Sequence, residues 1–426
     1  MIVYMICYAA GMLFSRISLY ALSGIVLMFA AAVLFLQDMR GPGLPVRLRA
    51  LFSLSFVGGQ GLACLKLSRL QADWEWGTWA VLFLAYTGFW LAFEGLRLRN
   101  GPAVRGNRPG RLTGVRRGRL FLSIVLVTGI SLLAFCAEAS LLHYIPLLVH
   151  GVPHAYSWFH ISGVHYFTVS CVLVPAMAAA WTAAEPGAAP REKNIVRVCV
   201  FLSFLIPVLC VSRSQMLLAA MFAGVTLLLT GKDRIPAWAG AAGAAVLLVF
   251  YVILTVARSH SVEYLNGIFE MKRNYPIFIS QPYIYIANNY DNLNCLIRDL
   301  PAHTWGLRSL FPLWALSGLK FVFPQLAASP LYVTKTELTT LTLFYDAWYD
   351  FGTVGVVLFS AALGSLCYFL EKRIGEDHGP MVCVFFAQVA VYLGLSFFTT
   401  WFSNPTTWFY FAVTLAVTLF CGHRGS

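Results

Sequence analysis

Apolar runs of about 20 residues recur along nearly the whole chain, and short polar segments separate them. An α-helix of that length crosses the hydrocarbon core of a bilayer. The pattern predicts about twelve spanning helices, with these limits: 1–14, 17–36, 50–66, 77–96, 120–137, 164–184, 195–212, 214–230, 236–256, 346–370, 380–400 and 406–421. We therefore expect an all-α polytopic membrane protein that forms a single membrane domain over residues 1–426.

Composition agrees with this class, since 59% of the 426 residues are hydrophobic and 11% are charged. That balance excludes an ordinary soluble domain. The N-terminal run "MIVYMICYAAGMLF" has no basic start and no clear cleavage site, so we expect a retained helix rather than a signal peptide. Nine of the ten cysteines fall in apolar runs without a C-x-x-C pair, which indicates small buried residues rather than a disulfide framework.

Basic residues set the expected orientation. Nineteen of the 30 Lys and Arg residues lie in connections on one face of the twelve-helix arrangement, eight of them in the segment 97–119. Cytoplasmic loops carry such an excess, so we expect this face and both termini in the cytoplasm. A net charge of +12 would also suit nucleic acid. The arginines of 97–119 lie between spans without interleaved aromatic residues, so topology explains them better and we expect no nucleic-acid partner.

The stretch "VLCVSRSQMLLAAM", residues 208–221, places an arginine between two apolar runs. Within one long span Arg213 would lie near the bilayer centre, at a cost of about 3 kcal/mol. A turn at 212–215 avoids that cost and puts Arg213 at the external interface, because the next connection is basic and cytoplasmic. Arg213 there either binds a substrate or anchors at lipid headgroups.

Two external segments hold most of the remaining polar residues: 138–163, and 257–345 between the ninth and tenth helices. The long segment and its exit contain seven of the 18 acidic residues, and a loop of this length without function is uncommon. The shorter segment and its exit contain five of the nine histidines. His150 and His154 have a metal-binding spacing, but no nearby cysteine or acidic pair completes a site, so we expect no metal and no cofactor. A sugar-binding groove is the alternative.

Two stretches of the long segment look helical. "QPYIYIANNYDNLNCLIR" has an apolar face of Tyr283, Ile286, Tyr290, Leu293 and Ile297, and a polar face of Asn288, Asp291, Asn294 or Cys295, and Arg298. "TWGLRSLFPLWALSGLKFVFP", residues 304–324, contains two basic residues and a proline near its middle. We interpret it as an interfacial or re-entrant helix.

External cations beside carboxylates suit a lipid-linked phosphate or diphosphate, since each charge-assisted hydrogen bond contributes about 1.5–3 kcal/mol. Cations also stabilise a departing diphosphate, and a carboxylate accepts the proton of an attacking hydroxyl. The candidate diphosphate-binding residues are Arg213, Arg258, Lys272, Arg273 and Arg298. The candidate catalytic carboxylates are Asp291, Asp346 and Asp350. The candidate glycan-lining residues are Trp158, His160, Tyr283 and Tyr290.

Each group of candidates has a simpler alternative. The loop cations could form a solvated face. Asp291 could satisfy a local turn with Asn288 or Asn292, and Asp346 or Asp350 could cap the tenth helix.

Four stretches together resemble the bacterial oligosaccharide repeat-unit polymerases, the Wzy-like O-antigen and capsule polymerases. They are "HYIPLLVHG", "SRSQMLL", "YIANNYDNLN" and "TTLTLFYDAWYDFGTVGVVLFSAALG", and the resemblance covers roughly Glu138 to Gly364. It implies a GT-C-like, all-helical glycosyltransferase without metal or nucleotide sugar. Such an enzyme moves a growing glycan from one undecaprenyl diphosphate to another lipid-linked repeat, outside the plasma membrane. The resemblance also implies that Arg213, Arg258 and Asp350 match residues of the family's motifs.

We therefore expect a multi-pass glycosyltransferase in the plasma membrane of a bacterium. Its expected partners are undecaprenyl-diphosphate-linked oligosaccharides and the lipid bilayer, with flippase and chain-length regulator proteins as further partners. One alternative is an O-antigen ligase, although "IANNYDNL" lacks the histidine usual in the large loop of ligases. Another is a transporter or flippase, but the predicted spans carry few charges between their ends and show no internal repeat.

Overall fold

The computed structural model describes residues 1–41, 43–104, 117–149, 155–184, 187–230, 262–327, 329–376 and 379–422. Within these ranges the structure is helical, with one isolated β-bridge and no strand. Six helical segments are long and apolar enough to cross a membrane: Tyr20–Met39, Trp76–Asn100, Gly118–Leu142, Val164–Ala184, Arg213–Thr230 and Tyr345–Glu376. The predicted all-α, multi-pass class is therefore confirmed. The count of twelve spans and the GT-C fold stay predictions, and the ninth predicted span, 236–256, lies outside the described residues.

The chain divides into two compact units, where the sequence pattern predicts one membrane domain. Unit 1 comprises Met1–Asn107, Ser261–Arg373 and Tyr392–Trp408. Unit 2 comprises Arg108–His260, Ile374–Val391 and Phe409–Ser426.

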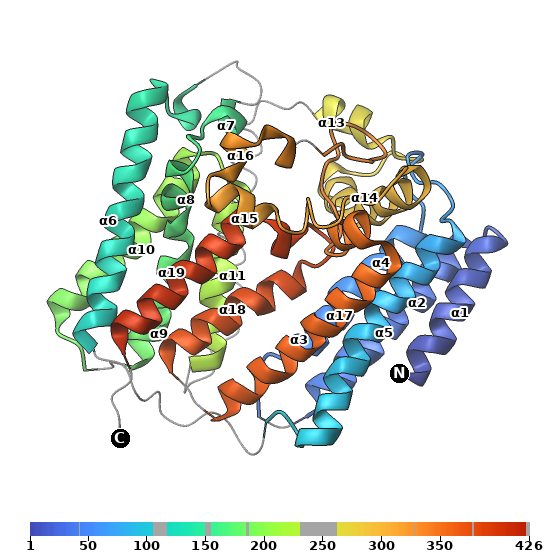
Figure 1. Ribbon diagram of the computed structural model, residues 1–426, viewed down its shortest axis with the longest axis horizontal. Coiled ribbons are helices and arrows are strands. Elements are labelled where there is room, and N and C mark those ends of the chain that lie inside the picture. The colour runs from blue at the N-terminus through green and yellow to red at the C-terminus, as the bar shows by residue number, and fades with distance from the viewer. Residues whose placement is uncertain are drawn as a thin grey trace. The chain divides into compact units, whose positions relative to one another are not determined.

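Unit 1 is built from long helices that come from both halves of the sequence (Figure 1). Its elements are α1 (Ile2–Arg16), α2 (Tyr20–Met39), α3 (Leu48–Phe52), η1 (Ser53–Val57), α4 (Gly58–Cys64), α5 (Trp76–Asn100), α13 (Val262–Phe269), α14 (Ile277–Asp299), α15 (Phe311–Leu316), α16 (Leu319–Val322), η4 (Pro324–Leu326), α17 (Tyr345–Glu376) as far as Arg373, and η5 (Trp401–Ser403).

The third predicted helix is continuous but irregular. It consists of α3, the π-helical turn η1 and α4, so the "GGQG" sequence continues the helix rather than breaking it. Glycine is required at Gly59 because a Cβ there would lie 2.4 Å from the phenol oxygen of Tyr290. The helix ends before Lys66, which has a positive φ of 49°.

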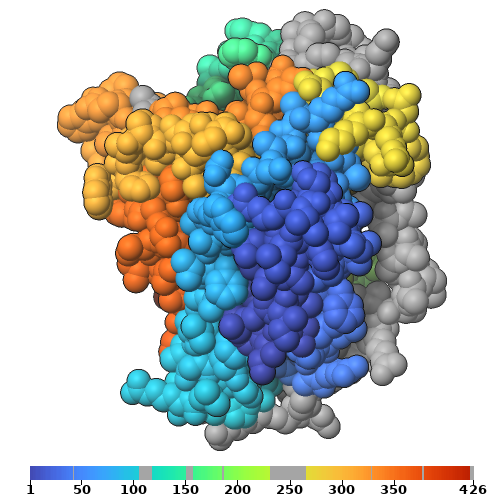
Figure 2. Space-filling view, turned by 90° about the vertical axis from the view of Figure 1, so that its right-hand side faces the viewer, coloured from blue at the N-terminus to red at the C-terminus, as the bar shows by residue number. Residues whose placement is uncertain are grey.

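One end of unit 1 gathers the connections that the charge pattern assigns to the outside. Ser68, in the connection after α4, forms the isolated bridge with Met271, in the turn after α13. The ammonium group of Lys272 lies 5.8 Å from the ring of Tyr20, at the start of α2. Figure 2 shows the yellow turn after α13 at this end and the cyan end of α5 at the other.

The opposite end of unit 1 holds connections that are predicted to be cytoplasmic. Arg49 bonds Asp38 at 2.5 Å and Glu94 at 2.8 Å, and the amide of Leu48 donates to Glu371 at 2.8 Å. These contacts join the ends of α2, α5 and α17 to the start of α3. Within unit 1 these contacts gather connections at two ends, as the charge pattern predicts, while the full topology and the assignment of one end to the cytoplasm stay predictions.

Helices α5 and α17 run side by side in unit 1, as Figure 1 shows. A Cβ at Gly364 would lie 2.2 Å from the carbonyl oxygen of Phe89, so only glycine permits this approach. The rings of Phe93 and Tyr368 meet edge to face one turn further along.

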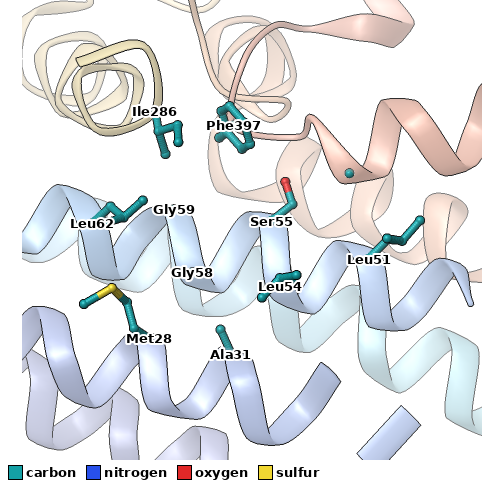
Figure 3. Close-up of a pocket in the computed structure, with 11 residues that line it drawn as sticks. Met28, Ala31, Leu51, Leu54, Ser55, Gly58, Gly59, Leu62, Ile286 and Phe397 are labelled. Carbon is teal, nitrogen blue, oxygen red and sulfur yellow. The ribbon is translucent and has the colours of Figure 1, made fainter. Parts of the chain in front are cut away.

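An apolar groove of about 400 Å³ lies in unit 1 between α2, the α3–η1–α4 helix and α14 (Figure 3). Ser55 is its polar side chain, and the other lining residues are Met28, Ala31, Leu51, Leu54, Gly58, Gly59, Leu62, Ile286, Gly394 and Phe397. The groove has no charged lining residue, so it suits hydrocarbon.

Unit 2 is also helical. Its elements are α6 (Arg117–Leu142), η2 (Pro146–Leu148), α7 (Ala155–Trp158), α8 (Val164–Val169), η3 (Ser170–Leu173), α9 (Val174–Ala184), α10 (Pro190–Leu209), α11 (Arg213–Thr230), α18 (Pro380–Gly394) through Val391, and α19 (Pro405–Cys421) from Phe409. The helix is interrupted between α10 and α11 at residues 210–212, so the turn beside Arg213 is present but lies about two residues before its predicted position, 212–215. Val211 in this turn has a positive φ of 54°.

Several predicted segments differ in the structure. Helix α17 ends six residues beyond its predicted end, α18 ends six residues before it, and the predicted span 164–184 consists of α8, η3 and α9. Helix α6 continues through Glu138 to Leu142, five residues beyond its predicted end. The segment 304–324 forms two short helices, α15 and α16, rather than one, because Gly318 between them adopts a left-handed conformation. Its exposed apolar side chains, among them Phe321 at 63% and Val322 at 68%, agree with an interfacial location.

Surface labelling of introduced cysteines tests the arrangement of unit 1. Arg69, Arg273 and Arg99 are all exposed; the first two adjoin the Ser68–Met271 bridge, and the third lies at the C-terminal end of α5. We expect a membrane-impermeant maleimide to label Arg69→Cys and Arg273→Cys in intact cells and Arg99→Cys only after permeabilisation. Labelling of positions 69 and 273 from different sides would contradict the fold, and the reverse pattern at all three would contradict the predicted orientation.

Candidate functional site

Helix α14 carries a polar face that is buried rather than solvated. Asp291 is 2% exposed and accepts hydrogen bonds from Lys66 at 2.7 Å, from the indole of Trp74 at 2.9 Å and from Gln71 at 2.8 Å. The Lys66 ammonium is itself 2% exposed and also donates to the carbonyl of Ala72 at 2.5 Å. These partners come from the 65–75 connection, not from the local turn that the sequence offers as an alternative. Asp291 therefore holds this connection against α14.

The asparagines of α14 hold other loops in the same way. Asn292 donates to the carbonyls of Leu338 and Thr340, and Asn294 accepts a hydrogen bond from Thr78 at 2.6 Å. Thr334 donates to Asn288 at 2.8 Å. The "ANNYDNLN" stretch thus joins the 65–75 connection, the start of α5 and the segment 334–340.

The two tyrosines predicted to line a glycan groove lie in the core. Tyr290 has no exposed surface, and its hydroxyl donates to the carbonyl of Phe56 at 2.8 Å. Tyr283 is 7% exposed and donates to Gln71 at 2.7 Å. Burial raises the pKa of Tyr283 well above its usual range, so this hydroxyl stays protonated. Both side chains pack the interior in this structure and face no surface that a sugar reaches.

The described cations predicted in the long segment lie in two separate places. Lys272 and Arg273 are exposed at the turn after α13. Arg298 lies at the C-terminal end of α14 and bonds the neighbouring Asp299 at 2.7 Å, which lowers the pKa of that carboxyl group. Arg258 lies outside the described residues. Among the described residues, no hydrogen bond or ion pair joins Lys272, Arg273 or Arg298 to a carboxylate predicted to be catalytic.

Arg308 and Asp346 form a half-buried ion pair at the start of α17. The guanidinium Nε donates to the carboxylate at 2.6 Å, and the side chains are 15% and 5% exposed. The guanidinium also lies over the rings of Tyr345 and Tyr349, 5.5 Å and 4.9 Å from their centroids. Burial alone would lower the pKa of Arg308, but the Asp346 carboxylate raises it above its usual value. Among the described residues, no hydrogen bond joins the Nη atoms of Arg308 to another residue.

Asp350, one turn further along α17, organises the backbone that carries Arg308. Its carboxylate accepts hydrogen bonds from the amide of Arg308 at 3.2 Å, from the amide of Ser309 at 2.6 Å and from the hydroxyl of Thr304. The predicted cap of the tenth helix is therefore not what the structure shows. Asp350 binds the 304–309 turn instead of the first amides of its own helix, and Asp346 binds a side chain.

A pocket of about 450 Å³ lies in unit 1 beside this ion pair. Arg308 and Asp346 contribute charge, and hydroxyl or amide groups come from Ser329, Thr399, Thr400, Ser403 and Asn404. Its remaining lining residues are Leu307, Phe311, Leu326, Ala327, Leu331 and Pro405. The volume falls in the range of small-molecule sites. Polar groups of both charges beside an apolar wall are suited to a ligand with hydroxyl or phosphate groups and a hydrocarbon part.

Three predicted residues lie in unit 2. Arg213 is the first residue of α11 and is half-buried at the turn after α10. Trp158 is 71% exposed, and His160 is exposed two residues later. These two side chains lie on a surface that a ligand can reach, as a glycan-lining role requires.

The sequence pattern missed two clusters. In the sequence Arg308 is a charged residue inside an apolar stretch. A charge in such a stretch needs a partner, and this requirement would have identified Arg308. The second cluster, in unit 2, joins Glu138 to His165, and nothing in the residue spacing predicts it. Within the described ranges no group of three or more metal-ligating side chains comes together.

A scan of protein-family models, a search of curated proteins and a search of solved structures each found no match to this chain.

Two substitutions on α14 test whether Asp291 is structural. Removing one partner of a buried ion pair costs about 3–5 kcal/mol, whereas an exposed pair contributes about 0–1 kcal/mol. We expect Asp291→Asn to lower the thermal unfolding temperature in detergent strongly, because Lys66 would be buried without a counter-charge. Asp299→Asn, which removes the exposed pair with Arg298, is the control and should change it little. An Asp291→Asn protein of unchanged stability would show that the pair does not hold the fold.

Proposed function

We propose that this protein is a membrane glycosyltransferase that polymerises undecaprenyl-diphosphate-linked oligosaccharide repeat units on the outer face of a bacterial plasma membrane. The observation that carries the proposal is the pocket beside Arg308, whose Nη donors remain available at the end of unit 1 predicted to lie outside. The resemblance of the sequence to repeat-unit polymerases supports the same substrate class.

Arg308 is suited to bind a diphosphate. Its guanidinium is fixed through Nε by Asp346, and the two Nη groups keep the planar two-point geometry that matches a phosphate. The Asp346 carboxylate offsets the positive charge of Arg308 through Nε and leaves the Nη donors unused. This lowers the cost of burying the guanidinium when no ligand is bound. An anionic ligand then adds charge-assisted hydrogen bonds.

The surroundings of Arg308 suit the rest of such a substrate. The hydroxyl and amide groups of Thr399, Thr400, Ser403 and Asn404 are partners for sugar hydroxyl groups. The apolar groove of about 400 Å³ in the same unit is suited to the prenyl chain. The exposed apolar side chains of α15 and α16, next to the pocket in sequence, support a location of this edge at the lipid interface.

The proposed reaction joins two lipid-linked glycans. An acceptor hydroxyl oxygen forms a bond to the anomeric carbon of the donor sugar, and its proton leaves. The bond from that carbon to the diphosphate oxygen breaks, and the electron pair departs with undecaprenyl diphosphate. A fixed guanidinium stabilises the charge that develops on the leaving group.

Purified protein in detergent or liposomes tests the proposed function directly. We expect incubation with an undecaprenyl-diphosphate-linked repeat to yield products that grow by whole repeats, detected by gel or mass spectrometry. Transfer of the glycan to a lipid A core instead would identify a ligase. Movement of the lipid-linked repeat across liposomes without any lengthening would identify a transporter.

Substitution of Arg308 tests its role. We expect Arg308→Ala to reduce elongation roughly ten- to hundred-fold, since a charge-assisted contact contributes about 1.5–3 kcal/mol. Arg308→Lys should keep the Asp346 pair and the fold but recover elongation only in part, because an ammonium group lacks the two-point contact. Lys320→Ala removes another half-buried cation of the same segment and serves as the control. Full activity in a folded Arg308→Ala protein would remove Arg308 from the site.

A further inference from the structure

Asp346 supplies the carboxylate of the pocket beside Arg308. Among the lining residues that the structure describes, no other is acidic and none is a histidine. Asp346 lies in the first turn of α17, and its side chain is 5% exposed, so bulk water reaches the carboxylate little. A group that accepts a proton from a bound hydroxyl must lie within hydrogen-bond reach of it. Asp346 is therefore placed to act on a hydroxyl bound in this pocket.

One oxygen of the Asp346 carboxylate is left for a substrate. Oδ1 accepts the 2.6 Å hydrogen bond from Nε of Arg308, whereas no hydrogen bond among the described residues reaches Oδ2. The other two predicted carboxylates differ. Asp291 accepts hydrogen bonds from three side chains, and Asp350 accepts them from two amides and a hydroxyl. Both are buried, and neither lines the pocket, so they hold the fold instead.

The segment 399–404 supplies hydroxyl groups to the same pocket. Its backbone is fixed by hydrogen bonds from the amide of Trp401 to the carbonyl of Thr399 at 3.0 Å and from the amide of Ser403 to the carbonyl of Thr400 at 2.9 Å. Among the described residues, no hydrogen bond joins the hydroxyls of Thr399, Thr400 or Ser403 to another group. Placed polar groups of this kind orient a ligand. A sugar bound through them would bring its own hydroxyls into the pocket that Asp346 lines.

Arg308 brings the proposed leaving group close to the same carboxylate. Its Nε is bonded to Oδ1 of Asp346, and its Nη groups are the donors proposed for the diphosphate. The diphosphate and Asp346 thus bind different atoms of one guanidinium. A bound diphosphate also balances the positive charge of Arg308, which Asp346 offsets in the empty pocket. Binding of the donor lipid therefore releases the carboxylate from that role.

We infer that Asp346 is the proton acceptor for the attacking hydroxyl of the acceptor sugar. This inference rests on the proposed glycosyl transfer. As the acceptor oxygen bonds to the anomeric carbon, its proton moves to Oδ2 of Asp346. The bond from that carbon to the diphosphate oxygen breaks, and its electron pair leaves with undecaprenyl diphosphate. The carboxylic acid then gives the proton to water, which restores the carboxylate.

The alternative is that Asp346 only holds Arg308 in place. In that case the side chain at 346 needs an oxygen for Nε but no basic group. Asparagine separates the two roles, because its amide oxygen accepts a hydrogen bond from Nε while the amide takes up no proton at neutral pH. Asp299→Asn is the matched control, since it makes the same change at a carboxylate whose side chain is 41% exposed and which does not line the pocket.

The experiment measures elongation of an undecaprenyl-diphosphate-linked repeat by the full-length protein. We expect Asp346→Asn to lower kcat about 100-fold or more and to keep a KM close to that of the wild type. Asp299→Asn should keep both constants. A wild-type kcat in Asp346→Asn, or a loss confined to KM, would overturn the inference while the proposed function stands. Failure of the wild-type protein to elongate the repeat would overturn the proposed function itself.

Sodium azide gives a second readout that a purely structural role would not move. Azide bonds to the anomeric carbon without losing a proton, so it needs no base, and undecaprenyl diphosphate leaves as before. We expect the ratio of glycosyl azide to elongated product, measured by mass spectrometry, to rise about 100-fold in Asp346→Asn and to stay at the wild-type value in Asp299→Asn. An unchanged ratio in Asp346→Asn would overturn the inference.

A neutral double variant keeps the test decisive if Asp346→Asn does not fold. Arg308→Gln combined with Asp346→Asn leaves no unpaired charge at this half-buried position, which removes the main cost of the single substitution. Loss of Arg308 slows departure of the diphosphate in both reactions, so the ratio of glycosyl azide to elongated product still reports the base. We expect the same rise in this ratio, and a wild-type ratio would again overturn the inference.

Discussion

The buried pair of Lys66 and Asp291 is the interaction on which the rest of unit 1 depends. Burying a carboxylate or an ammonium group alone would cost too much solvation free energy. The pair can be buried because Trp74, Gln71 and a backbone carbonyl complete its hydrogen bonds. The pair allows α14 to turn a polar face inward. From that face the contacts continue through Asn288 and Asn292 to Thr334, and from Tyr332 to the hydroxyl of Tyr345 at the first turn of α17. The geometry around Arg308 is thus connected to a buried charge pair on α14.

Hydrophobic length is the feature that sequence predicts best in this protein. A spanning helix needs a minimum number of apolar residues, so the runs that form α2, α5, α6, α11 and α17 could be placed within a few residues. Helix α14 was predicted as a helix for a different reason, its periodicity. Its surroundings were not predictable, because periodicity separates two faces without saying what covers the polar one. In segment 304–324 the apolar length suggested one helix, and the conformation of Gly318 divides it.

The sequence predicted which kinds of residue form the candidate site, but it did not predict which residues pair with one another. Asp346 and Asp350 were identified because acidic residues cluster in the long external segment and its exit, and the structure places both at the 304–309 turn. Their partner Arg308 lies 38 residues from Asp346, and Lys66 lies 225 residues from Asp291, distances over which a single sequence carries no pairing signal. Glu138 and His165 are 27 residues apart and meet only because α8 packs against α6. Each of these contacts follows from tertiary packing rather than from local pattern.

The conformation of the 304–309 turn depends on Gly352, a residue that carries no charge and no polar side chain. Its backbone, at φ 60° and ψ −148°, interrupts α17 just after Asp350. A Cβ at this position would come within 2.8 Å of Nε2 of His303, the residue before Thr304. Any larger residue would therefore be strained by the positive φ and would crowd the imidazole of His303, next to the turn that carries the guanidinium. Loss of activity in natural variants of this region need not involve a polar residue at all, since a single methyl group would suffice.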